Sequence, residues 1–505
     1  MDEIIVTAYA ASLRNARSIE GGEALIEEIK TAETREQLLE FLATQGNIHL
    51  EKFYEAGRGK GLSYEEIFSS LKKQKGRKGL SNSEICAAAA LWGAQSVGAK
   101  IQLVSLANHF DEKGKLLHED VLRQTIQETD GFMISSPVYF GDRSSLSQKL
   151  IDYIRNDSVL KSSIRGKIYG GSAVGAKRNG GQETCLIYQM NDMIELGTLG
   201  VGNDYETTSQ YGGTGHAGDV GTMAKDDYGL KTAIGTGKRL ASVATMMHMA
   251  TEYDLNDKPK LCLCVLQEQN DRLFHYFQSI VEEIRGKADI MIIRLDLEEI
   301  LPCMACDICP TRVGLDQDFR CIRGKQDALH RYHNNLLDSD VIVPAMLSPN
   351  DRTGLVSVYQ AFIERLRYIR RGDYALSNRL IAPLIISEIG SNENLNMRMI
   401  TSFIRHHTVM HAPIIGWFQN NRLLNKDDLI NGLNSVIDQS RRVTLGRLIG
   451  AVLRNEIILY KPIGYVLSTA KDSASDSLKK RAESIRKRIE KTGIEYKRRV
   501  HKKAG

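Results

Sequence analysis

The stretch that decides the fold is GFMISSPVYFGDRSSLSQKLIDYIR, residues 131–155. A short apolar run ends at Ser135-Ser136-Pro137, a turn follows, and an amphipathic segment begins near Ser144. This order predicts a buried strand, a loop and a helix. Ligands of parallel sheets bind beyond the carboxyl ends of the strands, so the loop can offer backbone amides and an aromatic ring to a flat ligand. An ordinary turn with a half-buried tyrosine is the alternative. The loop residues concerned are Pro137, Val138, Tyr139, Phe140 and Gly141.

The same alternation of strand and helix extends to both sides of this stretch. Apolar runs predict strands at 3–10, 99–106, 131–137, 166–175 and 198–203. Helical patterns lie at 82–97, 118–130, 144–156, 180–196 and 227–252. Short apolar strands separated by helices favour a parallel sheet covered on both faces. With right-handed crossovers they predict a doubly wound, three-layer α/β/α domain over residues 1–250.

Residues 16–80 interrupt this plan between the first strand and the first helix of the alternation. The segment is polar and helical in pattern, which indicates a helical insertion. We expect a surface elaboration or an oligomer contact, with a lid over a bound cofactor as the alternative.

The second half repeats the alternation. Strands are predicted at 260–266, 288–297, 340–347, 380–390 and 413–418, with helices between them. Residues 258–430 therefore form a second domain of the same α/β class, an internal duplication at domain scale. Residues 431–505 are predicted to be a basic helical tail, and twelve of the 25 residues from Lys479 to Lys503 are Lys or Arg. Such a tail is a solvated surface or a docking site for an anionic partner.

Four cysteines gather within the second half, at Cys303, Cys306, Cys309 and Cys321. Their C-x2-C-x2-C spacing allows three thiolates to converge on one centre, and the fourth can close the site from a longer loop. Four thiolates suit a [4Fe–4S] cluster or structural zinc. Zinc sites favour paired C-x2-C knuckles, so the third close cysteine favours iron–sulfur. Unligated thiols near a turn are the alternative reading.

Composition fits a globular protein. Of 505 residues, 42% are hydrophobic and 26% charged, and the formal net charge is +5. No apolar run reaches 18 residues, so no membrane span is expected. The N-terminus lacks the basic region of a signal peptide. The eight cysteines suit a reducing cytoplasm better than a disulfide framework, and nucleic acid is not expected as a partner.

Three segments of the first half carry a family resemblance. SPVYFG followed by S-x-x-x-K-x-I-D resembles the isoalloxazine loop of NADPH-dependent FMN reductases. VGAKRNGGQET (174–184) and YGGTGHAGDVG (211–221) resemble the next two flavin-site segments of flavodoxin-like NAD(P)H:quinone oxidoreductases. The resemblance implies bound FMN, with Gly180, Gly181 and Gln182 at the flavin. It also implies a phosphate loop after the first strand, split here by the insertion into Ser12, Arg14 and Asn15 before it and Ser81, Asn82 and Ser83 after it. Hydroxyls and amides at a helix N-terminus favour phosphate.

The cysteine segment resembles that of iron–sulfur flavoproteins, which implies a [4Fe–4S] cluster near a flavin; the gap before the fourth cysteine is longer here, which keeps zinc open. The flavin loops of this half are eroded. LQEQNDRL lacks glycine, and Ser348-Pro349 lacks a following aromatic–glycine pair, so we expect no FMN there.

Together these features predict a cytoplasmic FMN-dependent NAD(P)H oxidoreductase. It would pass electrons to a quinone-like, flavin or redox-protein acceptor, through a cluster or directly. The alternative is an electron-transfer or redox-sensing flavoprotein without a dedicated small-molecule substrate, or one with structural zinc. His216 is the candidate catalytic residue at the substrate face, or else a packing residue. The resemblance also implies a homo-oligomer.

Overall fold

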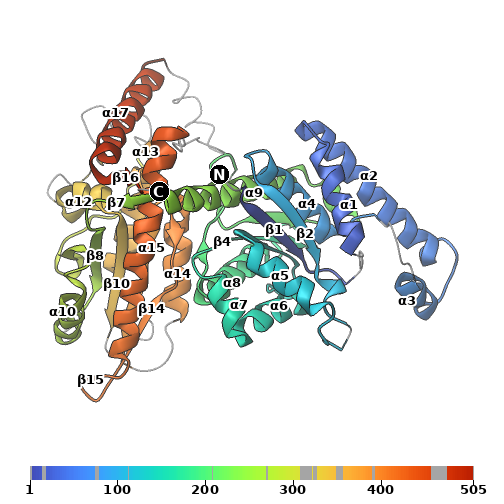
Figure 1. Cartoon of the computed structure of the whole chain (residues 1–505), viewed down its shortest axis with the longest axis horizontal. Helices are drawn as coiled ribbons and strands as arrows, with labels where there is room; N and C mark the ends of the chain where they lie inside the picture. The colour runs from blue at the N-terminus through green and yellow to red at the C-terminus, as the bar shows by residue number, and fades with distance from the viewer. Residues whose placement is uncertain are drawn as a thin grey trace. The chain divides into compact units, whose positions relative to one another are not determined.

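The computed structural model describes two compact units, Met1–Thr245 and Met246–Gly505. Figure 1 follows the chain through both. The described residues are 3–13, 19–73, 79–111, 113–207, 209–268, 271–306, 321, 323, 327–348, 357–388, 393–455 and 475–503.

The first unit contains a parallel sheet in the order β2-β1-β3-β4, and β5 and β6 both pair with β4. Numbered along the chain this is 2-1-3-4-5, the order of flavodoxin-like doubly wound sheets. The predicted α/β class with a mostly parallel sheet is therefore confirmed. The strands are β1 Ile5–Ala10, β2 Lys100–Ser105, β3 Gly131–Pro137, β4 Ile168–Gly175, β5 Leu199–Gly200 and β6 Gly213–His216.

Helices cover both faces of this sheet. Figure 1 shows α4 and α9 on one face and α5 to α8 on the other. Every residue of β4 is buried, as expected for a strand covered on two sides. The helices are α4 Asn82–Gln95, α5 Glu119–Glu128, α6 Ser145–Asn156, α7 Ser158–Ser163, α8 Gln182–Glu195 and α9 Asp227–Met249, with the 3₁₀ turns η2 Leu106–Asn108 and η3 Thr222–Lys225.

Small residues let α4 and α9 pack backbone to backbone. A Cβ atom on Gly93 of α4 would lie 2.2 Å from the carbonyl oxygen of Ile234, and one on Gly237 of α9 would lie 1.7 Å from that of Ala90. The alanine-rich sequence of α4 is buried almost all round. This close packing holds the C-terminal half of α4 against α9.

The insertion is helical where it is described. It contains α1 Ile19–Lys30, α2 Arg35–Phe53, the π-helical turn η1 Tyr54–Arg58 and α3 Tyr64–Lys73. A capping box formed by Thr34 and Gln37 starts α2. Helix α1 packs on β2, and α2 packs on α4 and η3.

The second unit has the order β9-β8-β10, followed by β11 and β12, then β13 and β14, then β15. The relative order again corresponds to 2-1-3-4-5. All these pairs are parallel except β14 with β15. The strands are β8 Lys260–Gln267, β9 Asp289–Arg294, β10 Val341–Ser348, β11 Leu380–Ile381, β12 Leu384–Ser387, β13 Val409–Met410, β14 Ile414–Gln419 and β15 Arg422–Leu423.

Helices and a small ribbon complete this unit. Strand β16 pairs antiparallel with β7, so the basic tail ends in a strand that the sequence pattern does not predict. Among the described residues, no helix combines the length and apolarity needed to cross a membrane. The remaining elements are η4 Ala250–Glu252, β7 Tyr253–Leu255, α10 Arg272–Ile284, η5 Leu295–Leu297, α11 Ala328–Arg331, α12 His333–Asp338, α13 Ser357–Asp373, α14 Glu393–Phe403, η6 Ile404–His406, α15 Lys426–Leu453, α17 Ser475–Arg499 and β16 Val500–Lys502.

Candidate functional site

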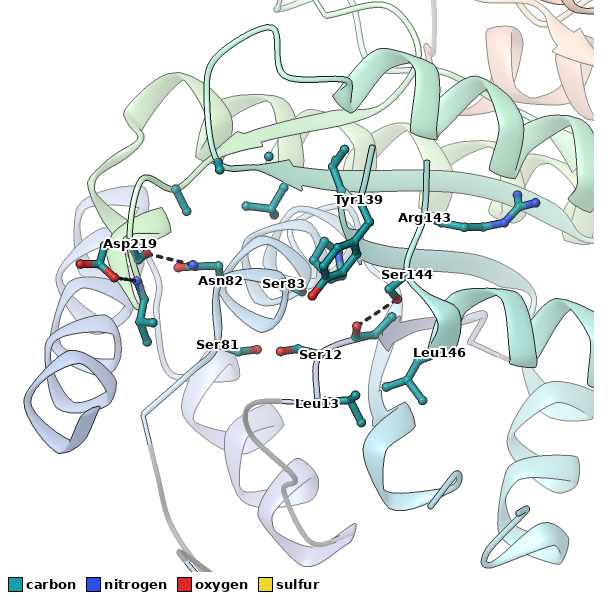
Figure 2. Close-up of a pocket in the computed structure, with 18 of the residues that line it drawn as sticks. Ser12, Leu13, Ser81, Asn82, Ser83, Tyr139, Arg143, Ser144, Leu146 and Asp219 are labelled. Carbon is teal, nitrogen blue, oxygen red and sulfur yellow. Dashed lines mark hydrogen bonds between the residues drawn. The ribbon is translucent and has the colours of Figure 1, made fainter. Parts of the chain in front are cut away.

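A cavity of about 600 Å³ lies at the carboxyl ends of the strands of the first unit. It is lined by the segments that follow β1, β3, β4 and β6, and it includes the switch point between β1 and β3. Seven residues predicted from sequence line it, among a larger set shown in part in Figure 2. The lining residues are Ala11, Ser12, Leu13, His49, Ser81, Asn82, Ser83, Pro137, Val138, Tyr139, Arg143, Ser144, Ser145, Leu146, Val174, Gly175, Ala176, Ala217, Gly218, Asp219 and Val220.

The N-terminus of α4 faces this cavity with a defined cap. The Ser81 hydroxyl accepts the Glu84 N–H, while the Glu84 carboxylate accepts the Ser81 N–H at 2.9 Å. The backbone N–H groups of Asn82 and Ser83 have no acceptor among the described residues. Figure 2 shows Ser12 and Ser81 pointing toward one another at this end. Hydroxyls and two open amides at a helix N-terminus make an anion site. Arg14 and Asn15 lie outside the described residues.

The side chain of Asn82 has a structural task. Its Nδ2 donates to the carbonyl oxygen of Asp219 at 3.1 Å, and its Oδ1 accepts the Met223 N–H at 3.1 Å. The amide therefore ties α4 to the 217–220 loop across the cavity (Figure 2). The backbone N–H of Asn82 and the second N–H of its Nδ2 are not used in these two bonds.

The loop after β3 is a tight turn that presents an aromatic ring. Tyr139 and Asp142 exchange both backbone hydrogen bonds, at 2.8 and 2.9 Å. Phe140 and Gly141 between them have φ values of 51° and 83°, which fit a type I′ turn. The Tyr139 side chain lines the cavity and is 59% exposed, whereas Phe140 is fully exposed and lies outside the lining.

The glycine turn before α8 packs directly on this loop. Gly181 has a φ of +96°, and a Cβ atom there would lie 2.7 Å from the Gly141 Cα. Neither glycine is among the lining residues, and neither is Gly180. Gln182 is buried and donates from Nε2 to the carbonyl oxygens of Lys177 and Gly215, at 2.8 and 3.0 Å. The structure therefore brings the two predicted flavin loops together, while Gly141, Gly180, Gly181 and Gln182 are not among the residues that line the cavity.

His216 lies at the end of β6, next to the lining residue Ala217 but outside the lining itself. Its backbone N–H donates to the Asp226 carboxylate at 2.7 Å. Asp226 also forms an ion pair with Arg178. The catalytic role of His216 remains a prediction.

Sequence reasoning missed several lining residues. Ser144 caps α6, accepts the Ser147 N–H and donates its hydroxyl to the Ala11 carbonyl oxygen at 3.2 Å, which holds the β1 and β3 loops together. Its position just before an amphipathic helix signals a cap. His49 comes from the insertion, far from every motif, and no local pattern identifies it.

Three of the four clustered cysteines are described, and Cys309 is not. Cys303 and Cys321 are half-buried and Cys306 is exposed. The backbone N–H of Ala305, which has a φ of 48°, donates to the Cys303 Sγ at 3.4 Å. Among the residues that the structure describes, no group of three potential ligands is close enough to hold a metal ion.

The other described thiols are buried. Burial raises the pKa of Cys86 to about 12 and that of Cys185 to about 12. Such thiols stay protonated and are poor ligands and nucleophiles.

Comparisons with known proteins give the family of the chain. Residues 68–210 match the family described as NADPH-dependent FMN reductase. An iron–sulfur flavoprotein of Methanocaldococcus jannaschii is 34% identical over 179 residues, which cover 33% of this chain and 92% of that protein. A NAD(P)H dehydrogenase (quinone) of Caulobacter vibrioides is 25% identical over 189 residues, with the same two coverages. A solved flavodoxin, a WrbA-like protein from Agrobacterium tumefaciens, aligns at 20% identity with a TM-score of 0.25, covering 32% of this chain and 89% of that one. The chain belongs to the flavodoxin-like NADPH-dependent FMN reductase family of FMN-containing oxidoreductases.

Proposed function

We propose that this protein binds FMN in the cavity of the first unit, takes reducing equivalents from NAD(P)H and passes them to a quinone-like, flavin or redox-protein acceptor. The observation that carries the proposal is the cavity itself. At one end it combines serine hydroxyls with the open amides of Asn82 and Ser83, and the Tyr139 ring lines it beyond them. Its volume of about 600 Å³ lies within the range of cofactor sites.

The residues present fit FMN. The phosphate would lie against Ser12 and the first turn of α4, where the helix dipole favours negative charge. The ring would lie along Pro137, Val138 and Tyr139, with the turn at Gly180 and Gly181 supporting that loop from behind. When bound, FMN supplies hydride and electron-transfer chemistry. In this arrangement the protein would hold the cofactor and orient its ring.

For the second unit we propose a tandem flavodoxin-like domain without FMN, bearing a thiolate-bound centre at Cys303, Cys306, Cys309 and Cys321. The N–H donated to Cys303 Sγ supports a ligand role, because hydrogen bonds to cysteine sulfurs stabilise thiolates and tune cluster potentials. A [4Fe–4S] cluster is favoured over zinc. Homo-oligomeric assembly and a cytoplasmic location remain predictions.

Titration of the flavin-free protein with FMN tests the main proposal. We expect about one FMN per chain, quenched flavin fluorescence and rapid NAD(P)H oxidation when a quinone is added. A protein that takes up no FMN would contradict the proposal. Slow turnover with quinones but efficient exchange with a redox protein would favour the electron-carrier alternative.

A further inference from the structure

The helical insertion reaches the cavity that we assign to FMN. His49 of α2 lines the cavity and is only 5% exposed. Among the described residues, it is the lining residue that the insertion contributes. The expectation of a surface elaboration does not account for a buried imidazole at a cofactor site.

Backbone contacts on two sides fix the position of His49. A Cβ atom on Gly79 would lie 2.4 Å from the His49 backbone nitrogen and 2.9 Å from its Cβ. One turn earlier on α2, a Cβ atom on Gly46 would lie 2.5 Å from the Gly221 carbonyl oxygen. Helix α2 is thus wedged between the approach to α4 and the loop that follows β6.

A second contact binds the insertion to the rim of the cavity. Arg58 of η1 forms an ion pair with the lining residue Asp219 at 3.4 Å. Asp219 is the residue whose carbonyl oxygen accepts from Asn82. The insertion therefore touches the same loop that α4 holds in place.

We propose that His49 is a cofactor-binding residue that donates a ring N–H to the phosphate of FMN. Gly79 is two residues before the Ser81 cap, so the imidazole enters the cavity at the end that holds the Asn82 and Ser83 amides. A charge-assisted hydrogen bond to a phosphate oxygen is among the stronger kinds. The inference rests on the proposed function.

The test compares FMN with riboflavin, which lacks the phosphate. Dissociation constants for both are measured by flavin fluorescence on flavin-free wild type, His49→Ala, His49→Gln and the control Glu51→Gln, which alters an exposed position on the same helix. We expect His49→Ala to weaken FMN by roughly tenfold or more and riboflavin by less than about twofold. His49→Gln keeps a donor and should retain most of the FMN affinity. The control should match wild type.

The outcomes separate this inference from the proposed function. If wild type binds no FMN, the proposed function fails. If wild type binds FMN and His49→Ala binds it equally well, or if His49→Ala weakens FMN and riboflavin alike, the inference is wrong and His49 is a packing residue. Should His49→Ala fail to fold, His49→Phe and His49→Gln decide, because both keep a large side chain and only glutamine keeps a donor. Equal FMN affinity in these two variants would then overturn the inference.

Discussion

At the scale of single residues, the same residue type has different roles within one cavity. Ser81 and Ser144 cap helices with their hydroxyls. Ser83 lines the cavity, and its backbone carbonyl oxygen accepts a hydrogen bond from the Ser135 hydroxyl at 2.8 Å. The Asn82 side chain joins α4 to the 217–220 loop and to Met223 through two hydrogen bonds. A hydrogen-bonding residue in such a motif can therefore support the fold as well as the predicted cofactor site.

Gly181 should not tolerate a side chain. In Gly181→Ala, the strain of the positive φ adds to the steric clash of the new Cβ with the Gly141 backbone. Moving a flexible side chain can relieve neither of them. We expect a loss of about 2–3 kcal/mol in the free energy of unfolding and weaker FMN binding, measured by denaturant titration and flavin fluorescence. Gly98→Ala is the matched control, because Gly98 has a φ of +94° but open space around its missing Cβ. Equal losses in the two variants would argue against the loop contact.

Where a local pattern exists, the predicted residues lie at the cavity, and their contact with FMN stays a prediction. Ser12, Ser81 and Tyr139 follow strands or precede a helix within a motif, and the structure places them at the cavity. His49 could not be predicted, because its location depends on how α2 packs against Gly79 and Gly221, two residues that are far apart in the chain. Long-range packing of an insertion leaves no periodic signal in sequence.

At the scale of elements, the site depends on how α4 is held. Its capping box satisfies the first turn, its small residues bring it close to α9, and Asn82 joins it to the 217–220 loop.

The sequence predicts this helix and its approximate start. It does not predict β6, because the glycine-rich segment 211–221 reads as a loop and becomes a strand only by pairing with β4. The predicted strand 380–390 is divided into β11 and β12 around Pro383, which has no N–H for a ladder.

Removing the Asn82 side chain should loosen the loop that borders the cavity. In Asn82→Ala, the Met223 N–H and the Asp219 carbonyl oxygen lose their partner, so we expect a loss of about 1–2 kcal/mol in stability. FMN should bind several-fold more weakly because the loop moves relative to α4. Denaturant titration and FMN titration measure the two effects. Asn191→Ala, which removes an exposed hydrogen bond to Glu195 within α8, is the control; if it matches Asn82→Ala, the bracing role is wrong.

Replacing Cys306 should remove a metal centre and spare the flavin. We expect Cys306→Ser to lose bound iron and the broad visible absorption of a thiolate-bound cluster, because a four-thiolate site loses one ligand. FMN content should be unchanged, since the predicted flavin site lies in the other unit. Metal analysis and absorption of anaerobically purified protein check this, with Cys86→Ala, a buried thiol, as control. Loss of zinc would identify a structural site, and unchanged metal content would contradict a ligand role.

At the scale of the whole molecule, the chain contains the same strand order twice. Strand β8 pairs with β9 and β10 in parallel, as β1 pairs with β2 and β3. The tandem domains that the alternating apolar runs indicate stay a prediction. The C-terminal region is less exposed than the predicted basic tail. The basic tail is not uniformly a solvated face, because Arg499 at the end of α17 is fully buried.

Arg499 binds three carboxylates of the second unit. It forms a bidentate pair with Asp340 at 2.9 and 2.7 Å and single contacts with Asp257 and Glu495 at 2.7 Å each. Burial alone would raise the pKa of Asp340, but Arg499 and Arg447 outweigh it and hold that pKa below its usual range. Burial would also raise the pKa of Glu495, but the nearby arginines outweigh this effect and lower that pKa to about 2. No composition-based argument predicts such a network, since it joins residues from separate segments of the chain.

Breaking this network should destabilise the second unit and make α17 accessible. In Arg499→Ala, the Asp340 carboxylate stays buried but loses its bidentate ion pair, which lowers the free energy of unfolding by about 3–5 kcal/mol. Both carboxylates have lowered folded pKa values, so their contribution is fully present above the unfolded values near 4 and is lost as pH falls toward 2. We therefore expect wild type to lose stability steeply below about pH 4 and Arg499→Ala to show a shallower acid dependence. Denaturant titration at several pH values and limited proteolysis of 475–503 measure both effects.

The control is Arg498→Ala. Arg498 is the exposed neighbour of Arg499 and has a 3.9 Å contact to Asp257, so its removal should change stability by less than about 0.5 kcal/mol. Similar behaviour of the two variants would mean that apolar contacts with α15, and not the buried charges, hold α17. In these contacts, Leu445 and Ile449 of α15 pack near Tyr496 and Val500.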